Sequence, residues 1–274
     1  MAWSNLLTVF TKPWKEDSIE ALADRIAGLG FGGIELPVRD GYQVNPANYR
    51  DALAGAVSAL AKKNLTIASI AGTIDADLIR EMGRNGVKIL RIMLNADPKK
   101  NYIEQEEAYY KTVSDLLPLL EKSGVALGVQ NHYGNFCGCS SAGLMRFVSR
   151  FPKAQVGAVL DLAHCAISGE IPEFALDIAA SHLIMVNMKN GSIRRNNYEN
   201  AAEAEWKSVW TTAQHGALSW KRSAAELRKR NYQGPICLTA EYSGSGKPIE
   251  GSETDALIRQ DLAYWKSLPL PGQP

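Results

Sequence analysis

The sequence predicts a single-domain α/β protein folded as a (β/α)8 barrel, the TIM-barrel architecture. Short apolar runs alternate with segments whose apolar residues recur at helical spacing, from one end of the chain to the other. Eight such pairs fit into the 274 residues, and barrels of this type commonly occupy about 250 residues as one domain. No Pro-, Ser- and Gly-rich linker divides the sequence, so we expect one domain over residues 1–274.

The expected elements follow in strict alternation. The eight apolar runs predict strands at residues 6–10, 34–36, 65–70, 87–93, 125–129, 156–160, 183–188 and 235–240. Helices are predicted at residues 19–29, 48–63, 75–83, 104–122, 142–151, 172–180, 223–230 and 253–268, followed by a tail at 269–274. The first turn, residues 10–14, contains no glycine, whereas an open doubly wound sheet usually carries a Gly-rich phosphate loop there. The sequence therefore favours a closed barrel and predicts no nucleotide cofactor.

One connection, residues 192–218 after the seventh strand, is longer than a plain loop of this fold. Loops of that size are often lids or binding loops. Its Trp206, Trp210 and His215 have two interpretations. They either cover a ligand or belong to a surface helix that packs its tryptophans on the barrel.

Composition excludes several classes of protein. The formal net charge is +1, which is not the basic balance of a nucleic-acid binder. No apolar run approaches the ~18 residues of a membrane span, and residues 1–5 do not resemble a signal peptide. Four cysteines in a chain of this length do not form a disulfide framework, so we expect reduced thiols and a cytoplasmic location. A homo-oligomer is compatible with the sequence.

Polar side chains gather where the expected strands end. The fifth strand is the clearest case, because its apolar run ends in Gln130-Asn131-His132. In barrels of this type the catalytic groups come from the C-terminal ends of the strands. The full set is Lys12, Glu35, Arg39, Arg91, Gln130, Asn131, His132, Asp161, His164, Asn187, Lys189 and Glu241. We interpret it as an active or binding site, although Glu35 and Arg91 could instead form a structural ion pair, and His132 could orient other groups.

Several of these tips, in order, resemble the sugar phosphate isomerase/epimerase superfamily of xylose isomerase-like barrels. The matching stretches are residues 30–36, Gln130-Asn131-His132, Asp161-x-x-His164 followed by Gly169-Glu170, residues 186–190 and Ala240-Glu241-Tyr242. The resemblance covers nearly the whole chain. The superfamily also includes endonuclease IV, ketose 3-epimerases, hydroxypyruvate isomerase and 3-dehydroshikimate dehydratase. The resemblance therefore implies membership of the superfamily and no particular substrate.

The resemblance implies a divalent metal held by four residues. By position these are Gln130, Asp161, Asn187 and Glu241, where relatives typically hold Glu, Asp, His and Glu. The two amides are neutral, hard ligands that suit Mg²⁺ or Mn²⁺ better than Zn²⁺, and they lower the negative charge of the set. The rival interpretation is a metal-free site in which the ammonium of Lys189 or Lys12 supplies the positive charge.

Two subgroups fit poorly. Endonuclease IV requires a histidine-rich trinuclear zinc cluster, and this chain has four histidines. Ketose 3-epimerases use two glutamates on opposite sides of the substrate. No Glu or Asp occurs between Gly124 and Leu160, so one partner is absent.

Sugar isomerisation requires a base, an acid and a positive centre for the enediolate oxygens. We expect Glu241 to be the base. His164 and His132 are expected to hold or protonate substrate oxygens. Lys189, or a metal on Asp161 and Glu241, would be the positive centre. The residues expected to bind a small anionic or polyhydroxylated carbohydrate are Lys12, Glu35, Arg39, Arg91 and Asn131.

The main hypothesis is therefore a sugar or sugar-phosphate isomerase or epimerase. Two alternatives stay open: a lyase or dehydratase that forms the same enolate, and a barrel that only binds sugar. The cysteines Cys137, Cys139 and Cys165 near the site are interpreted as structural, because C-x-C is not a standard zinc spacing. Residues 243–246, Ser-Gly-Ser-Gly, are either a phosphate-binding loop or a flexible connector.

Overall fold

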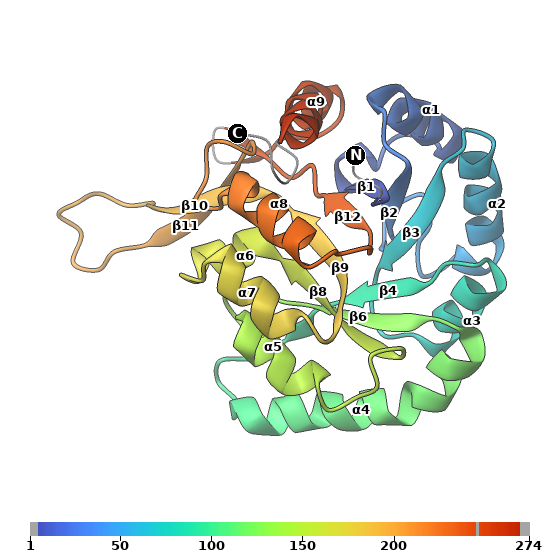
Figure 1. The fold of residues 1–274 in the computed structure, drawn as a ribbon, viewed down its shortest axis with the longest axis horizontal. Helices are drawn as coiled ribbons and strands as arrows, with labels where there is room; N and C mark the ends of the chain where they lie inside the picture. Colours follow the sequence, from blue (N-terminus) through green and yellow to red (C-terminus); the bar gives the residue numbers. More distant parts are fainter. Residues whose placement is uncertain (1–4, 245–246, 269–274) are drawn as a thin grey trace.

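The computed structural model describes residues 5–244 and 247–268 and confirms the barrel (Figure 1). Eight parallel strands close in the order β1-β12-β9-β8-β6-β4-β3-β2. The barrel strands are β1 (Leu7–Phe10), β2 (Gly33–Pro37), β3 (Thr66–Ala71), β4 (Ile89–Ile92), β6 (Ala126–Gln130), β8 (Val156–Asp161), β9 (Leu183–Met188) and β12 (Ile236–Leu238). The eight expected strands are thus present, and each lies within or overlaps its predicted range.

Helices surround the barrel on its outer face (Figure 1). They are the 3-10 turn η1 (Lys12–Trp14) and α1 (Ile19–Leu29), α2 (Tyr49–Ala61), α3 (Ala76–Arg84), α4 (Tyr102–Ser123), α5 (Ser141–Val148), α6 (Leu162–Ile167), α7 (Pro172–Ala179), α8 (Trp220–Lys229) and α9 (Ser252–Ser267). The predicted start of α1 is confirmed, because the Ser18 side chain accepts a hydrogen bond from the Ala21 amide. The prediction that strands and helices alternate strictly was wrong at one place, because the short helix α6 was not expected. Asp161 caps α6 and so begins it directly at the tip of β8.

The interior of the barrel below the site is filled by apolar side chains. The residues are Phe10, Ala71, Ile89, Val159, Met185 and Cys237, with Ile184 packed against them. Gly157 makes room for this packing, because a Cβ there would lie 2.5 Å from Ile184 Cγ2. The barrel is therefore a packed core that opens only at the strand ends.

The long connection after β9 is a β-hairpin, so the surface-helix interpretation was wrong. Strands β10 (Asn190–Arg195) and β11 (Trp206–Thr211) pair antiparallel, with Gly191 opposite Trp210. Figure 1 shows the hairpin projecting away from the barrel. Position 191 requires glycine because the Trp210 ring approaches its backbone closely, and a Cβ there would lie 2.6 Å from that ring.

Two small antiparallel pairs complete the described chain. Strand β5 (Leu94–Asn95) pairs with β7 (Phe136–Cys137), and β13 (Ser243–Gly244) pairs with β14 (Lys247–Pro248). The rest of the predicted phosphate loop, residues 245–246, lies outside the described residues, as do the predicted tail at 269–274 and the first four residues. Within the described chain, the helices are all too short or too polar to cross a membrane.

Candidate active site

A cavity of about 220 Å³ lies at the C-terminal ends of the barrel strands. Ten of the twelve predicted tip residues line it: Lys12, Arg39, Arg91, Gln130, His132, Asp161, His164, Asn187, Lys189 and Glu241. The sequence prediction did not assign Phe10, Met93, Tyr133, Ser208 and Thr239 to the site, and it named Trp210 only as a residue that could cover a ligand. Tyr133 could have been found, because it directly follows the polar tip of the fifth strand.

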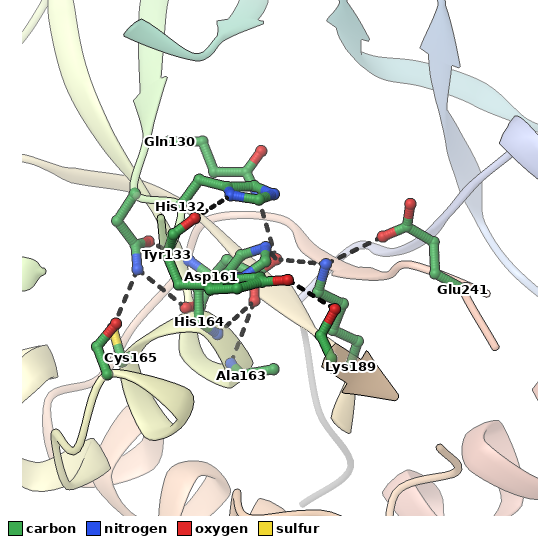
Figure 2. A network of polar contacts seen from close by, with 12 residues as sticks. Gln130, His132, Tyr133, Asp161, Ala163, His164, Cys165, Lys189 and Glu241 are labelled. Carbon is green, nitrogen blue, oxygen red and sulfur yellow. Dashed lines mark hydrogen bonds and ion pairs between the residues drawn. The ribbon is translucent and has the colours of Figure 1, made fainter. Parts of the chain in front are cut away.

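Lys189 lies between two carboxylates at the centre of this cavity (Figure 2). Its Nζ is 3.0 Å from Glu241 Oε2 and 3.5 Å from Asp161 Oδ2. Burial by itself would lower the pKa of Lys189, but the facing carboxylates outweigh it and raise that pKa. The ammonium is therefore charged at every physiological pH.

The two carboxylates differ in their surroundings. Burial would raise the pKa of Glu241, but Lys189 and Lys12 hold it well below its usual value, and Lys12 Nζ lies 2.7 Å from Glu241 Oε1. Asp161 is fully buried, and burial raises its pKa despite Lys189. Asp161 uses Oδ1 to accept from the Ala163 and His164 amides, so that Oδ2 faces the cavity.

The imidazole rings of His132 and His164 lie against each other beside Lys189 and its two carboxylates, with ring centroids 3.9 Å apart. His132 Nδ1 is 2.8 Å from the Tyr133 carbonyl oxygen, so this nitrogen carries the proton and Nε2 is left as an acceptor. Burial lowers the pKa of His132 to about 4. His164 is also neutral, because burial and then Lys189 lower its pKa. Neither ring nitrogen of His164 has a hydrogen-bond partner among the described residues, although Nε2 is 3.5 Å from Asp161 Oδ2.

The β10–β11 hairpin forms one wall of the site. Lys189 Nζ lies 4.0 Å from the centroid of the Trp210 ring, and that ring meets His164 edge-on at 87°. The Tyr133 hydroxyl donates to Ser208 Oγ at 2.6 Å and so ties the hairpin to the loop after β6. The expectation that this connection covers the site is therefore supported by Trp210, whereas Trp206 is largely exposed at 65%.

Two residues expected to bind substrate lie behind the cavity wall. Glu35 is fully buried and accepts from Arg91 Nε at 2.7 Å and Nη2 at 2.9 Å, so the structural ion pair is confirmed. Asn131 is also fully buried, and it accepts from the Asp161 amide at 2.7 Å and donates to the Asp161 carbonyl at 3.1 Å. These residues position Arg91 and Asp161, which do line the cavity.

The four positions that the resemblance assigns to a metal do not fit a divalent ion here. Gln130 Oε1 accepts from Arg91 Nη1, which turns its N–H toward Asp161 Oδ2 at 3.1 Å. A cation would meet that donor and the Lys189 ammonium in place of free oxygen ligands. Asn187 Oδ1 is buried without a hydrogen-bond partner in the described part of the chain, but one amide oxygen does not make a site. Residues 5–244 and 247–268 contain no group of three or more His, Cys, Asp or Glu arranged to hold a metal.

The cysteines near the site are not placed for catalysis or metal binding. All four of the chain are free thiols. Cys165 contacts Asn131 at 3.2 Å, and burial, followed by Glu170, raises its pKa well above the usual value. A thiol that stays protonated is inert, which agrees with the structural interpretation.

Comparison with known proteins agrees with this geometry. The chain belongs to the xylose isomerase-like TIM barrel family, whose model matches residues 23–268. No curated protein matches the sequence.

Solved structures match at low identity and so show the fold alone. A D-psicose 3-epimerase with D-tagatose from Clostridium cellulolyticum H10 has a TM-score of 0.74 and 14% identity, with 98% of this chain and 99% of that chain covered. A probable 3-DHS dehydratase involved in petrobactin synthesis from Bacillus anthracis has a TM-score of 0.73 and 14% identity, with 96% and 99% covered. A 3-keto-D-glucoside 4-epimerase from E. coli has a TM-score of 0.70 and 13% identity, with 96% and 100% covered.

Proposed function

We propose that this chain is an isomerase or epimerase that moves a proton at a carbon next to the carbonyl of a sugar. The observation that carries the proposal is Lys189, a charged ammonium held between Asp161 and Glu241 in a polar cavity. Loss of the carbon-bound proton places negative charge on the carbonyl oxygen. A fixed positive charge beside that oxygen stabilises the enediolate and the transition state that leads to it.

The second requirement is a base, and we assign it to His132. Its ring is neutral because burial lowers its pKa to about 4, and its Nε2 is free to accept a proton. Glu241, the base expected from the sequence, contacts two ammonium groups that hold its pKa well below its usual value and below the lowered pKa of His132. It is therefore the weaker base of the two. In this arrangement Glu241 orients Lys189 and Lys12.

With these two groups, each proton and electron pair of the reaction can be followed. The carbon-bound proton passes to His132 Nε2. The electron pair of the broken C–H bond forms the C=C bond of the enediolate, and the π pair of the carbonyl moves onto the oxygen next to Lys189. Return of the proton from His132 to the neighbouring carbon, with a hydroxyl proton moved between the oxygens, gives an isomer. An epimer forms when a water molecule on the opposite face donates a proton to the same carbon, and the proton held by His132 neutralises the hydroxide that is left.

Substrate binding is assigned to Arg39, Arg91 and Lys12, which present three cations to the cavity. They suit a polyhydroxylated substrate that carries partial or full negative charge. The proposal needs no metal, because Lys189 supplies the positive centre that a divalent ion would otherwise provide.

A lyase or dehydratase is the second candidate, supported by the structural similarity to a protein described as a probable 3-DHS dehydratase. β-Elimination proceeds from the same enolate, and the loss of water or of an aglycone is visible in the product mass. Binding without turnover over the same sugars would support the third hypothesis, a sugar-binding barrel.

The experiment is exchange of the carbon-bound proton in D₂O, followed by NMR. The substrates are D-fructose, D-psicose, D-tagatose and 3-keto-D-glucosides, and the variants are His132→Gln and Glu241→Gln, with the surface variant Glu107→Gln as control. We expect exchange to be lost in the His132 variant and retained, at a reduced rate, in the Glu241 variant. The reverse pattern would assign the base to Glu241, and no exchange on any of these sugars would refute the proposed reaction.

A further inference from the structure

A second cavity, of about 230 Å³, adjoins the first. The two share Lys12, Ser208, Trp210 and Glu241, so they meet at the Lys12–Glu241 ion pair and at the Trp210 ring. We call them the inner and the outer cavity. Each is smaller than the ~300–1,000 Å³ typical of ligand pockets, and the two together reach that range.

The outer cavity differs from the inner one in chemistry. The inner cavity is dominated by charged and polar side chains. Outside the shared boundary, the walls of the outer cavity include the apolar surfaces of Pro13, Ala240, Tyr242, Pro248 and Ile249. Apolar surfaces of this kind can pack against an aromatic ring or the C–H face of a sugar ring.

Hydrogen bonds hold these walls in place. The Tyr242 hydroxyl donates to Asp261 Oδ2 at 2.7 Å, and the Ile249 amide donates to the Tyr242 carbonyl at 2.9 Å. On the opposite side, the Trp210 amide donates to Ser243 Oγ at 3.1 Å. The outer cavity is therefore a formed feature that joins the hairpin to the β13–β14 pair.

The charged side chains around the outer cavity have both signs, so they do not by themselves select an anionic ligand. Lys12 lines it but is bound to Glu241 at 2.7 Å, and the Glu250 carboxylate also lines it, 3.6 Å from Lys15. Lys207 and Lys247 add positive charge to the lining, so a phosphate is the rival occupant that the test must separate.

We infer that the substrate is a glycoside whose keto-sugar ring occupies the inner cavity and whose second group, an aromatic ring or another sugar, occupies the outer cavity. This inference rests on the proposed function for the reacting ring. The glycosidic bond then crosses the shared boundary beside Lys12 and Trp210. A free monosaccharide leaves the outer cavity to water, so it binds more weakly.

Calorimetric binding and D₂O exchange test the inference separately. The probes are methyl, phenyl and glucosyl 3-keto-D-glucosides in both anomers, which share the reacting ring and differ in the second group. We expect the phenyl or the glucosyl probe to bind at least about tenfold more tightly than the methyl probe, because burying a ring in the outer cavity removes apolar surface from water. Equal affinity for all three would overturn the inference, as would a tenfold preference for D-fructose 6-phosphate over D-fructose.

The variant Pro248→Glu places a carboxylate in the outer cavity at an exposed position outside the proposed catalytic group. It should reduce the advantage of the larger probes to about that of the methyl probe, while binding of the methyl probe stays unchanged. Ile193→Glu, at an exposed position of the hairpin that lines neither cavity, is the matched control. Equal weakening of all probes in Pro248→Glu would contradict the inference. Absence of exchange with every probe would refute the proposed reaction, and binding would still decide the inference.

Discussion

Replacing Lys189 with methionine removes the central charge of the site while nearly keeping the length of the side chain. The Nζ of Lys189 is 3.0 Å from Glu241 Oε2 and 3.5 Å from Asp161 Oδ2. At an effective dielectric constant of about 20, each contact corresponds to roughly 5 kcal/mol of Coulomb attraction. Desolvation of the buried groups offsets much of this, so we expect Lys189→Met to cost about 3–5 kcal/mol of unfolding free energy, the usual effect of removing one partner of a buried pair.

The catalytic effect of Lys189→Met should be larger than a loss of stability explains. Losing a fixed donor at the developing oxyanion typically costs about 10²–10³ in kcat. Urea denaturation measures the loss of unfolding free energy, and D₂O exchange on the fully folded variant measures the loss of catalysis. The double variant Lys189→Met/Asp161→Asn should recover part of the stability and none of the exchange. It removes the buried charge of Asp161, which loses its ammonium partner, whereas Glu241 keeps its contact with Lys12. Exchange within threefold of the unaltered protein in Lys189→Met would refute the role of Lys189.

Two further predictions concern residues around the cavity. Glu35→Ala should lower the unfolding free energy by about 3–5 kcal/mol, because it leaves Arg91 buried without its carboxylate. Glu107→Ala, which removes the exposed bidentate partner of Arg150, should lower it far less, because water screens an exposed ion pair. Equal costs in urea denaturation would contradict the structural role of the buried pair. Burial lowers the pKa of His132 from 6.5 to about 4, so between these pH values the unfolded chain binds more protons than the folded protein. The free energy of unfolding of the unaltered protein should therefore fall, relative to that of His132→Gln, by up to about 2 kcal/mol as the pH decreases from 6.5 to 4. Parallel curves of stability against pH for the two proteins would show that the ring is not buried as described.

The sequence was sufficient to predict the barrel because its signals are local. Apolar runs and helical periodicity each report on one element, and a closed barrel then brings the strand tips together regardless of loop details. Ten of the twelve predicted tip residues line one cavity for this reason. Glu35 and Asn131 differ because a tip position does not determine whether a side chain points into the cavity or toward a neighbouring strand.

The hairpin and the central ion pairs could not be predicted in the same way. The stretch Trp206–Thr211 carries no strict alternation of apolar and polar residues, and its partner strand lies ten residues away across a polar segment. The position of Lys189 depends on contacts with β8 and with the loop after β12, which are adjacent to β9 only once the barrel closes. Gln130 is a similar case, because its orientation is set by Arg91 on the neighbouring strand β4.

The metal dependence of proton exchange tests the central claim most directly. The measurement is D₂O exchange by protein whose metal content has been determined after exhaustive chelation. If Lys189 is the positive centre, exchange persists with less than about one metal ion per ten chains, and added Mn²⁺ or Mg²⁺ changes the rate little. Loss of exchange on chelation, with recovery on addition of Mn²⁺ or Mg²⁺, would contradict the assignment of Lys189 to this role.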